Sequence, residues 1–291
     1  MKRAADNPLN QAPLDYNQIQ AKTEPLPLSL DLPNEIWEDI FLKSNFKDLG
    51  NCYLVDKKWN QLTNETVLVN KMIYEGFCFN PSHWNEFCGE GTVSDDEIAK
   101  AYASLPKDII EILNSDYNGE RVIDTHMLVW MPESIKGEPL TINNFGKLLK
   151  EQPEFSRRPT GYGYINNSIV LQEGTAPIKS GWVLMTTDII PDSQKKRYVE
   201  QLILLENLNK NGQTDYRVPK IAEVIICIAA KYLRSKTRLF SEDPLTYTRC
   251  QERVRGFQAV VGSFIESGFR VDLHFSNEDH FGLAALRELC N

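Results

Sequence analysis

Two groups of acidic and histidine side chains in this 291-residue chain could do acid–base chemistry. Asp124 and His126 are two residues apart in a segment that reads as a strand, which would place both side chains on one face. His274, Asp279 and His280 could form a metal or acid–base cluster near the C-terminus. The first pair has no Ser or Cys nucleophile in a recognisable elbow, and Asp279 and His280 precede a predicted helix, where Asp commonly caps. We interpret both groups as structural and expect no catalytic residue.

The spacing Cys78-x4-His83-x4-Cys88 brings together residue types that can bind zinc. A zinc site needs a fourth ligand and tighter pairing, and no neighbouring Cys or His supplies one. We therefore predict a loop over residues 78–91 with incidental thiols, and no metal or cofactor. The six cysteines have no regular spacing, which is typical of reduced thiols in a cytosolic protein.

A polar, glycine-containing segment at residues 157–167 reads as a long loop. Its Gly161-Tyr-Gly163-Tyr sequence lacks the Lys and the strand–turn–helix context of a phosphate-binding loop. Tyr and Arg dominate the energetics of protein interfaces. We interpret the loop as a candidate recognition surface with four target-binding residues, Arg157, Arg158, Tyr162 and Tyr164.

The secondary structure predicted along the chain indicates an α+β fold. Residues 1–27, rich in Asn, Gln and Pro, read as a flexible segment. A helical half follows, in which Ser94 to Glu97 form a capping box, residues 107–114 read as a helix and residues 116–119 form a turn. Beyond it, strands and helices occur without regular βαβ alternation. The predicted strands are 122–131, 181–187, 245–249, 256–261 and 269–275, and the predicted helices are 193–209, a segment starting at Pro219, and 281–289.

Composition and charge narrow the classes of partner. The formal net charge is −8 and the pI is about 5.2, which argues against sequence-independent nucleic-acid binding, because such binding needs many Lys and Arg side chains. The N-terminus has no apolar signal-peptide core, and no run of 18 apolar residues occurs. We expect a cytoplasmic protein that binds neither nucleic acid nor membrane.

Residues 32–62 carry a series of apolar and basic residues at helical spacing. The series comprises Leu32-Pro33-x-Glu35-Ile36, Ile40-Phe41, Asp48-Leu49, Leu54-Val55 and Lys57-Lys58-Trp59. Pro33 suits the first turn of a helix, and Ile36 with Ile40 falls at i,i+4. Three short helices cannot bury so many large apolar groups by themselves, whereas a partner groove can.

This series resembles the F-box, the helical module that joins substrate receptors to cullin-type ubiquitin ligases. The resemblance implies that residues 28–75 dock on a Skp-type adaptor and through it on a cullin scaffold. Residues 76–118 would form a helical linker region, and residues 119–291 would bind an unknown target protein. The chain itself would be no enzyme, since its partners would catalyse transfer. The implied adaptor-binding residues are Leu32, Pro33, Ile36, Ile40, Phe41, Leu49, Leu54, Val55 and Trp59.

Three positions depart from the F-box pattern: Ser44 where leucine is usual, Phe46 where proline is common, and Asp56 where a small residue normally precedes the basic pair. A carboxylate at position 56 facing an apolar groove carries a desolvation cost. Two alternatives therefore stay open. One is an enzyme domain fused to an F-box-like module; the other is a structural interaction protein whose helical stripe packs within its own complex.

The C-terminal half gives a weaker resemblance. Its sequence at residues 181–185 and in the predicted helix after Pro191 is similar to that of uncharacterised F-box proteins of obligate intracellular bacteria. This implies an effector acting in a host cytoplasm, although an endogenous eukaryotic protein would look the same. Whether the target must be modified, for example as a phosphopeptide held by Arg157 or Arg158, stays open.

Overall fold

The computed structural model describes residues 77–155, 158–241, 243–274 and 279–289. The predicted F-box-like module at 28–75, with its nine adaptor-binding residues, lies outside the described residues. Within the described ranges the fold is mixed α+β, with eight helices and two larger sheets. The mixed α+β class predicted for residues 119–291 is therefore confirmed.

The first sheet has four strands in the order β1-β4-β8-β13. Strand β1 is parallel to β4, whereas β4 with β8 and β8 with β13 are antiparallel. All six residues of β4 are buried, so this strand has no face toward solvent. The bounds are Cys78–Phe79 for β1, His126–Met131 for β4, Gly181–Thr186 for β8 and Leu286–Leu289 for β13.

The second sheet has five strands in the order β12-β9-β10-β11-β7. Its centre is an antiparallel meander of β9, β10 and β11, and both edges are short parallel strands. The bounds are Tyr164–Ile165 for β7, Tyr247–Val254 for β9, Phe257–Ile265 for β10, Gly268–His274 for β11 and Phe281–Gly282 for β12. Two hairpins complete the strands, β2 (Asp116–Tyr117) with β3 (Glu120–Arg121) and β5 (Ser134–Ile135) with β6 (Glu138–Pro139).

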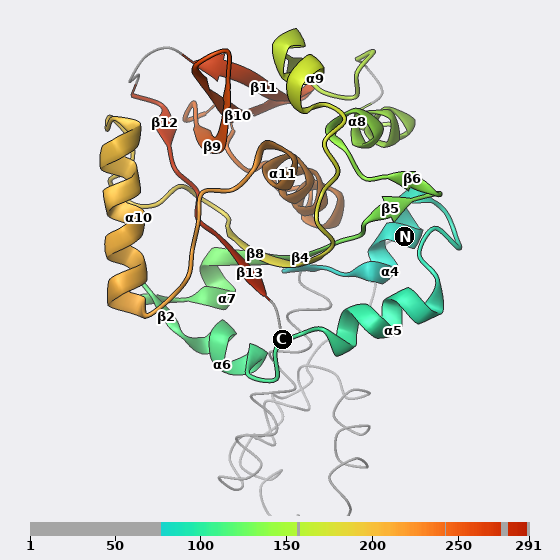
Figure 1. The fold of residues 1–291 in the computed structure, drawn as a ribbon, viewed down its shortest axis with the longest axis horizontal. Coiled ribbons are helices and arrows are strands. Elements are labelled where there is room, and N and C mark those ends of the chain that lie inside the picture. Colours follow the sequence, from blue (N-terminus) through green and yellow to red (C-terminus); the bar gives the residue numbers. More distant parts are fainter. Residues whose placement is uncertain (1–76, 156–157, 242, 275–278, 290–291) are drawn as a thin grey trace, which may run out of the picture.

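Helix α11 (Ile221–Ser235) lies between the two sheets and contacts both (Figure 1). Its sequence is apolar almost all round, and nine of its residues are buried, including Glu223. A helix of this kind is stable only when it is covered on every side. The prediction that the segment after Pro219 forms a central core helix is therefore confirmed.

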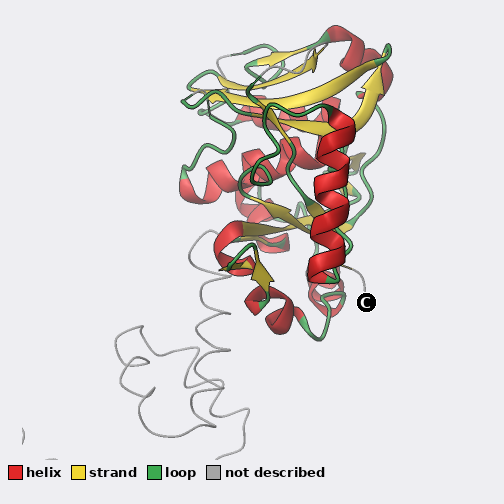
Figure 2. Cartoon of the chain, turned by 90° about the vertical axis from the view of Figure 1, so that its left-hand side faces the viewer, coloured by secondary structure: helices red, strands yellow, loops and turns green. Residues whose placement is uncertain are grey.

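The remaining helices surround this layered core (Figures 1 and 2). Helices α5 and α6 lie on the side of the first sheet away from α11, and α10 runs along one side of the molecule past both sheets. The bounds are Pro81–Cys88 for α4, Asp95–Ala103 for α5, Ile109–Asn114 for α6, Val122–Thr125 for α7, Ile142–Glu151 for α8, Asn167–Glu173 for α9 and Tyr198–Gly212 for α10.

Residues 77–118 belong to the same core as the rest of the described chain. Trp182 Nε1 in β8 donates to the carbonyl oxygen of Ala101 in α5 at 2.7 Å. Trp84 Nε1 in α4 donates to the carbonyl oxygen of Trp130 in β4 at 2.8 Å. Strand β1 also adds to the first sheet. Residues 77–118, which lie in the predicted helical linker region, thus pack against the domain that follows them.

Charged side chains fix the N-terminal end of α11. Arg217 Nη2 lies 2.6 Å from Glu223 Oε1 of α11 and 2.7 Å from Glu288 Oε1 of β13. The backbone N–H of Ile221, which opens the helix, donates to Glu252 of β9 at 3.0 Å. The helix is thus bonded to one strand of each sheet at its start, where its backbone donors have no partners of their own.

Three sequence predictions are wrong in their element type. Residues 78–91 are not a loop, because β1 pairs with β4 and Asn80 and His83 form a capping box for α4. Residues 281–289 contain β12 and β13 instead of a helix, since pairing with β8 overrides the local helical pattern. The strand expected from residue 122 begins only at His126, after the short helix α7.

Glu252 makes the stability of this fold depend on pH. Burial raises the pKa of its carboxyl to about 7. The folded state therefore holds this proton more tightly than the unfolded state, so the contribution of Glu252 to the free energy of unfolding falls as pH rises from about 4.5 to 7. The substitution Glu252→Gln imitates the protonated carboxyl, so we expect it to remove this fall, worth roughly 1–3 kcal/mol.

Urea unfolding near pH 5 and near pH 8 measures the effect for parent and variant. Glu90→Gln, the same change at an exposed position, is the matched control and is expected to follow the parent. The buried His83 and His126 have lowered pKa values and change stability with pH equally in parent and variant, so the difference between the two proteins isolates Glu252. An identical change of stability with pH in Glu252→Gln and in the parent would contradict the assignment.

Candidate functional site

A groove of about 940 Å³ lies beside α8 and is the candidate site for a partner. One wall is the outward face of α8, which presents side chains spaced one helical turn apart: Asn143, Asn144, Lys147, Lys150 and Glu151. The opposite face of this helix packs Ile142, Phe145 and Leu149 into the core. The other walls come from β6, from residues 159–162, and from the β7–α9 region, with Ile165, Val170 and Thr175.

Close backbone packing at Gly146 shapes this groove. A Cβ atom at position 146 would lie 2.6 Å from the carbonyl oxygen of Thr160 and 2.8 Å from Tyr162 Cε2. Gly161 has a φ of +78°, which favours glycine, and it packs against the Gly146 backbone. The Tyr162 hydroxyl donates to the carbonyl oxygen of Ile142 at 2.6 Å. The segment 159–162 is thus held against α8.

The structure describes three of the four sequence-predicted target-binding residues, and these three differ in exposure. Arg157 lies outside the described residues, and Arg158 is exposed beside Pro159 at the groove. Tyr162 is only 2% exposed, so it presents little surface to a partner even though it lines the groove. Tyr164 is 42% exposed and stacks with the Arg270 guanidinium at 5.1 Å. Their role in binding stays a prediction.

The charges at the groove were not anticipated from the sequence. Lys147 and Lys150 are exposed, and Lys147 Nζ donates to Asn144 Oδ1 at 2.9 Å. Glu151 is paired with Lys136 at 3.4 Å, while Glu138 adds a carboxylate at the β6 end. The signal that could have found these lysines is the apolar face of residues 142–149, which marks 147 and 150 as solvent-facing.

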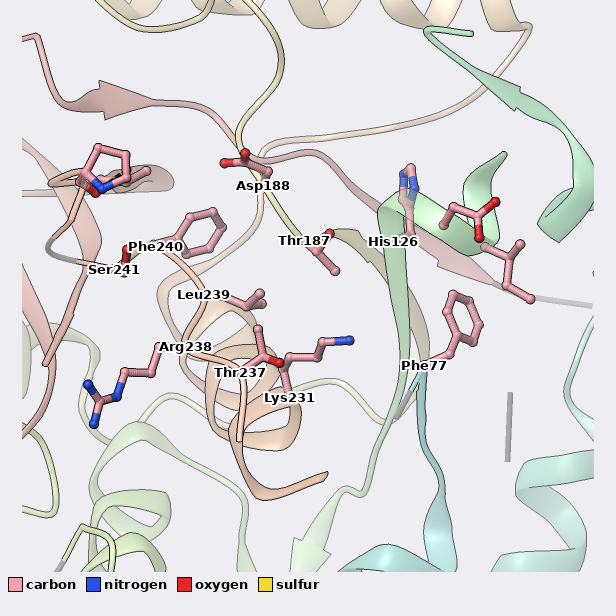
Figure 3. A pocket seen from close by; sticks show the side chains of 14 residues that line it. Phe77, His126, Thr187, Asp188, Lys231, Thr237, Arg238, Leu239, Phe240 and Ser241 are labelled. Atoms are coloured by element: carbon pink, nitrogen blue, oxygen red, sulfur yellow. Dashed lines mark hydrogen bonds between the residues drawn. The ribbon is translucent and has the colours of Figure 1, made fainter. Parts of the chain in front are cut away.

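A second cavity, of about 540 Å³, lies between the two sheets near the end of α11 (Figure 3). Lys231 extends its amino group into it, and burial lowers the pKa of that amine. Asp188 follows β8, and Phe240 and Ser241 lie on the side of the cavity opposite His126. This cavity also brings together Asp124 and His126, the pair singled out from the sequence.

His126 is bonded on both ring nitrogens. Its Nδ1 lies 2.9 Å from Thr125 Oγ1 and its Nε2 lies 2.9 Å from the Tyr216 hydroxyl. The ring of Tyr117 meets it edge-on at 4.6 Å. Burial lowers the pKa of His126 to about 3, so the ring is neutral at physiological pH. Asp124 is exposed and pairs with Arg121 at 2.8 Å. These contacts hold the His126 ring in the cavity wall.

The C-terminal histidines lie in an aromatic cluster. The rings of His274 and His280 are 6.1 Å apart, and Phe281 packs against both at 4.0 and 4.2 Å. Asp279 instead pairs with Lys195 at 3.4 Å. Within the described ranges, no group of three or more His, Cys, Asp or Glu side chains is placed to hold a metal ion.

The cysteines of the Cys78-x4-His83-x4-Cys88 pattern are buried. Burial raises the pKa of both thiols to about 12, which keeps them protonated. His83 Nδ1 accepts from the Asn80 backbone N–H at 3.0 Å as part of the α4 cap. All three residues thus have a place in the core or in a helix cap.

Among the helices of the described residues, none is both long and apolar enough to cross a bilayer.

Comparison with known proteins identifies one region. The model of the F-box-like family matches residues 29–74, the segment that contains the apolar series beginning at Leu32. No curated protein and no solved structure matches the chain. An F-box-like domain is a protein-interaction module, so the match supports a role in binding for the N-terminal part and leaves the described domain to be interpreted from its own structure.

Gly146 offers a direct test of the groove wall. We expect Gly146→Ala to destabilise the fold by about 1–3 kcal/mol, because the added Cβ would collide with the backbone at Thr160 and with the Tyr162 ring. Thermal or urea unfolding of the full chain measures the change.

Gly212→Ala is the matched control. Gly212 is the last residue of α10, and a Cβ there meets only Thr214 at an ordinary 3.5 Å. Alanine should therefore be neutral or stabilising by up to about 1 kcal/mol. Equal effects of the two substitutions would show that residues 159–162 do not pack against α8 as described.

Proposed function

We propose that this protein is an F-box substrate receptor, an adaptor that joins a Skp-type protein and a cullin scaffold to a target. The observation that carries the proposal is the F-box-like match at residues 29–74. It coincides with the segment in which Leu32, Pro33, Ile36 and Trp59 stand at F-box positions. The adaptor-binding set is the nine residues named from the sequence, from Leu32 to Trp59.

The mechanism in this proposal is proximity. The N-terminal module binds the Skp-type adaptor through apolar side chains, and aromatic anchors such as Phe41 and Trp59 supply much of the binding energy. The remainder of the chain holds the target, so that a target lysine is kept near the ubiquitin-conjugating machinery at a high effective concentration. No residue of this chain needs to take part in the transfer.

The shape of the described domain supports the proposed role of holding a target. One core connects residues from Phe77 to Leu289, so the domain can present a surface in a fixed orientation. The groove beside α8 and the exposed Tyr164 offer such a surface. In this proposal the protein acts in the cytoplasm, which is the host cytoplasm if the chain is a bacterial effector.

A binding titration of the full chain tests the adaptor role. Calorimetry against a purified Skp-type adaptor should show a 1:1 complex of sub-micromolar affinity with a negative heat-capacity change, because apolar surface becomes buried. The double substitution Leu32→Ala with Pro33→Ala should weaken binding by at least about tenfold, since two interface anchors are lost.

Pro8→Ala with Leu9→Ala is the matched control, because it makes the same two changes outside the family match. This control should bind as the parent does. A folded parent chain that gives no heat of binding would refute the adaptor role, as would equal affinities of parent and Leu32/Pro33 variant.

A further inference from the structure

The groove beside α8 is preformed. The backbone N–H of Asn143 at the start of α8 donates to the carbonyl oxygen of Gly174 after α9 at 3.0 Å. Further along α8, Gly146 packs against the backbone of residues 159–162. The walls are thus joined to α8 at two points, so a ligand does not have to order them, and that lowers the cost of binding.

The lining of the groove combines apolar and amide side chains. Pro139, Ile165 and Val170 contribute apolar surface, and Asn143 on α8 contributes an amide group. The Asn144 amide already makes hydrogen bonds within the wall, since its Nδ2 donates to the carbonyl oxygen of Pro139 at 3.0 Å and its Oδ1 accepts from Lys147. An extended peptide matches such a lining, because its side chains can fill apolar recesses while its main chain hydrogen-bonds to polar groups.

The solvent-facing side of the α8 wall is positively charged. Lys147 and Lys150 stand on the exposed face, and among the described ion pairs neither lysine is neutralised by a carboxylate. The nearby Glu151 is already paired with Lys136, and Arg158 adds a third exposed cation next to the lining residue Pro159. Of the two carboxylates that line the groove, Glu138 is the one outside the described ion pairs. The chain as a whole carries a net charge of −8, so the positive charge along the edge of this groove is a local exception.

We propose that this groove binds an extended, acidic segment of a target protein, with an apolar side chain in the recess and carboxylates against Lys147 and Lys150. The identity of the partner as a ubiquitination target rests on the proposed function, whereas the peptide-binding activity does not. Charge complementarity of this kind selects the partner and speeds its encounter with the groove.

Selection of short random peptides against the immobilised full chain tests the proposal. The selected peptides should be enriched in Asp and Glu flanking one or two apolar residues. A selected peptide carrying a fluorophore then gives an affinity by fluorescence anisotropy. Lys147→Glu with Lys150→Glu should weaken that affinity by at least about tenfold, and raising the salt concentration should weaken binding to the parent.

The matched control is Lys100→Glu with Lys107→Glu, which changes the net charge equally at two exposed positions outside the groove. The control should bind the peptide as the parent does. The proposal is overturned if selection gives no acidic enrichment, or if the groove variant and the control lose affinity equally. Both variants should bind the Skp-type adaptor normally, so a failed peptide test and a failed adaptor test are distinguishable.

Discussion

Helix α11 sits between two sheets and presents apolar side chains in almost every direction, and the other elements are arranged by the need to cover it. The first sheet covers one side and the β9–β11 meander covers the other. Because burying the helix removes its first N–H groups from water, Glu252 accepts from Ile221, and Arg217 joins Glu223 to β13. These polar contacts fix how the helix enters the core, and thereby the relative position of the two sheets.

Two cavities of the described domain differ in their chemistry. The cavity that contains Asp124 and His126 has a histidine engaged on both nitrogens and held neutral by burial. By contrast, the groove beside α8 has exposed lysines and walls held by backbone packing at Gly146. The F-box-like match at residues 29–74 adds a protein-interaction module to the same chain. Together these features support the proposal of a protein that connects two partners.

The sequence predicted the parts of this account in which local patterning decides the structure. The capping box at Ser94, the turn at 116–119 and the apolar helix after Pro219 all form as expected. The predictions from sequence failed where pairing between distant segments decides the structure. Residues 286–289 have a helical composition but complete the first sheet beside β8, and two-residue β1 becomes a strand only because β4 lies next to it.

The groove could not be predicted from the sequence, because it depends on contacts of α8 with residues 159–162 and 174. Tyr162 illustrates the limit, since a tyrosine in a polar, glycine-containing loop is in fact 2% exposed.

We propose that this chain binds an adaptor and a target at the same time, through separate sites. The most direct measurement is the affinity of the full chain for a groove-binding acidic peptide, determined without adaptor and again with saturating Skp-type adaptor. Independent sites predict the same dissociation constant in both conditions, within about a factor of two, and a complex that contains all three components. Loss of peptide binding when the adaptor is present would contradict the account, because the two sites would then exclude each other.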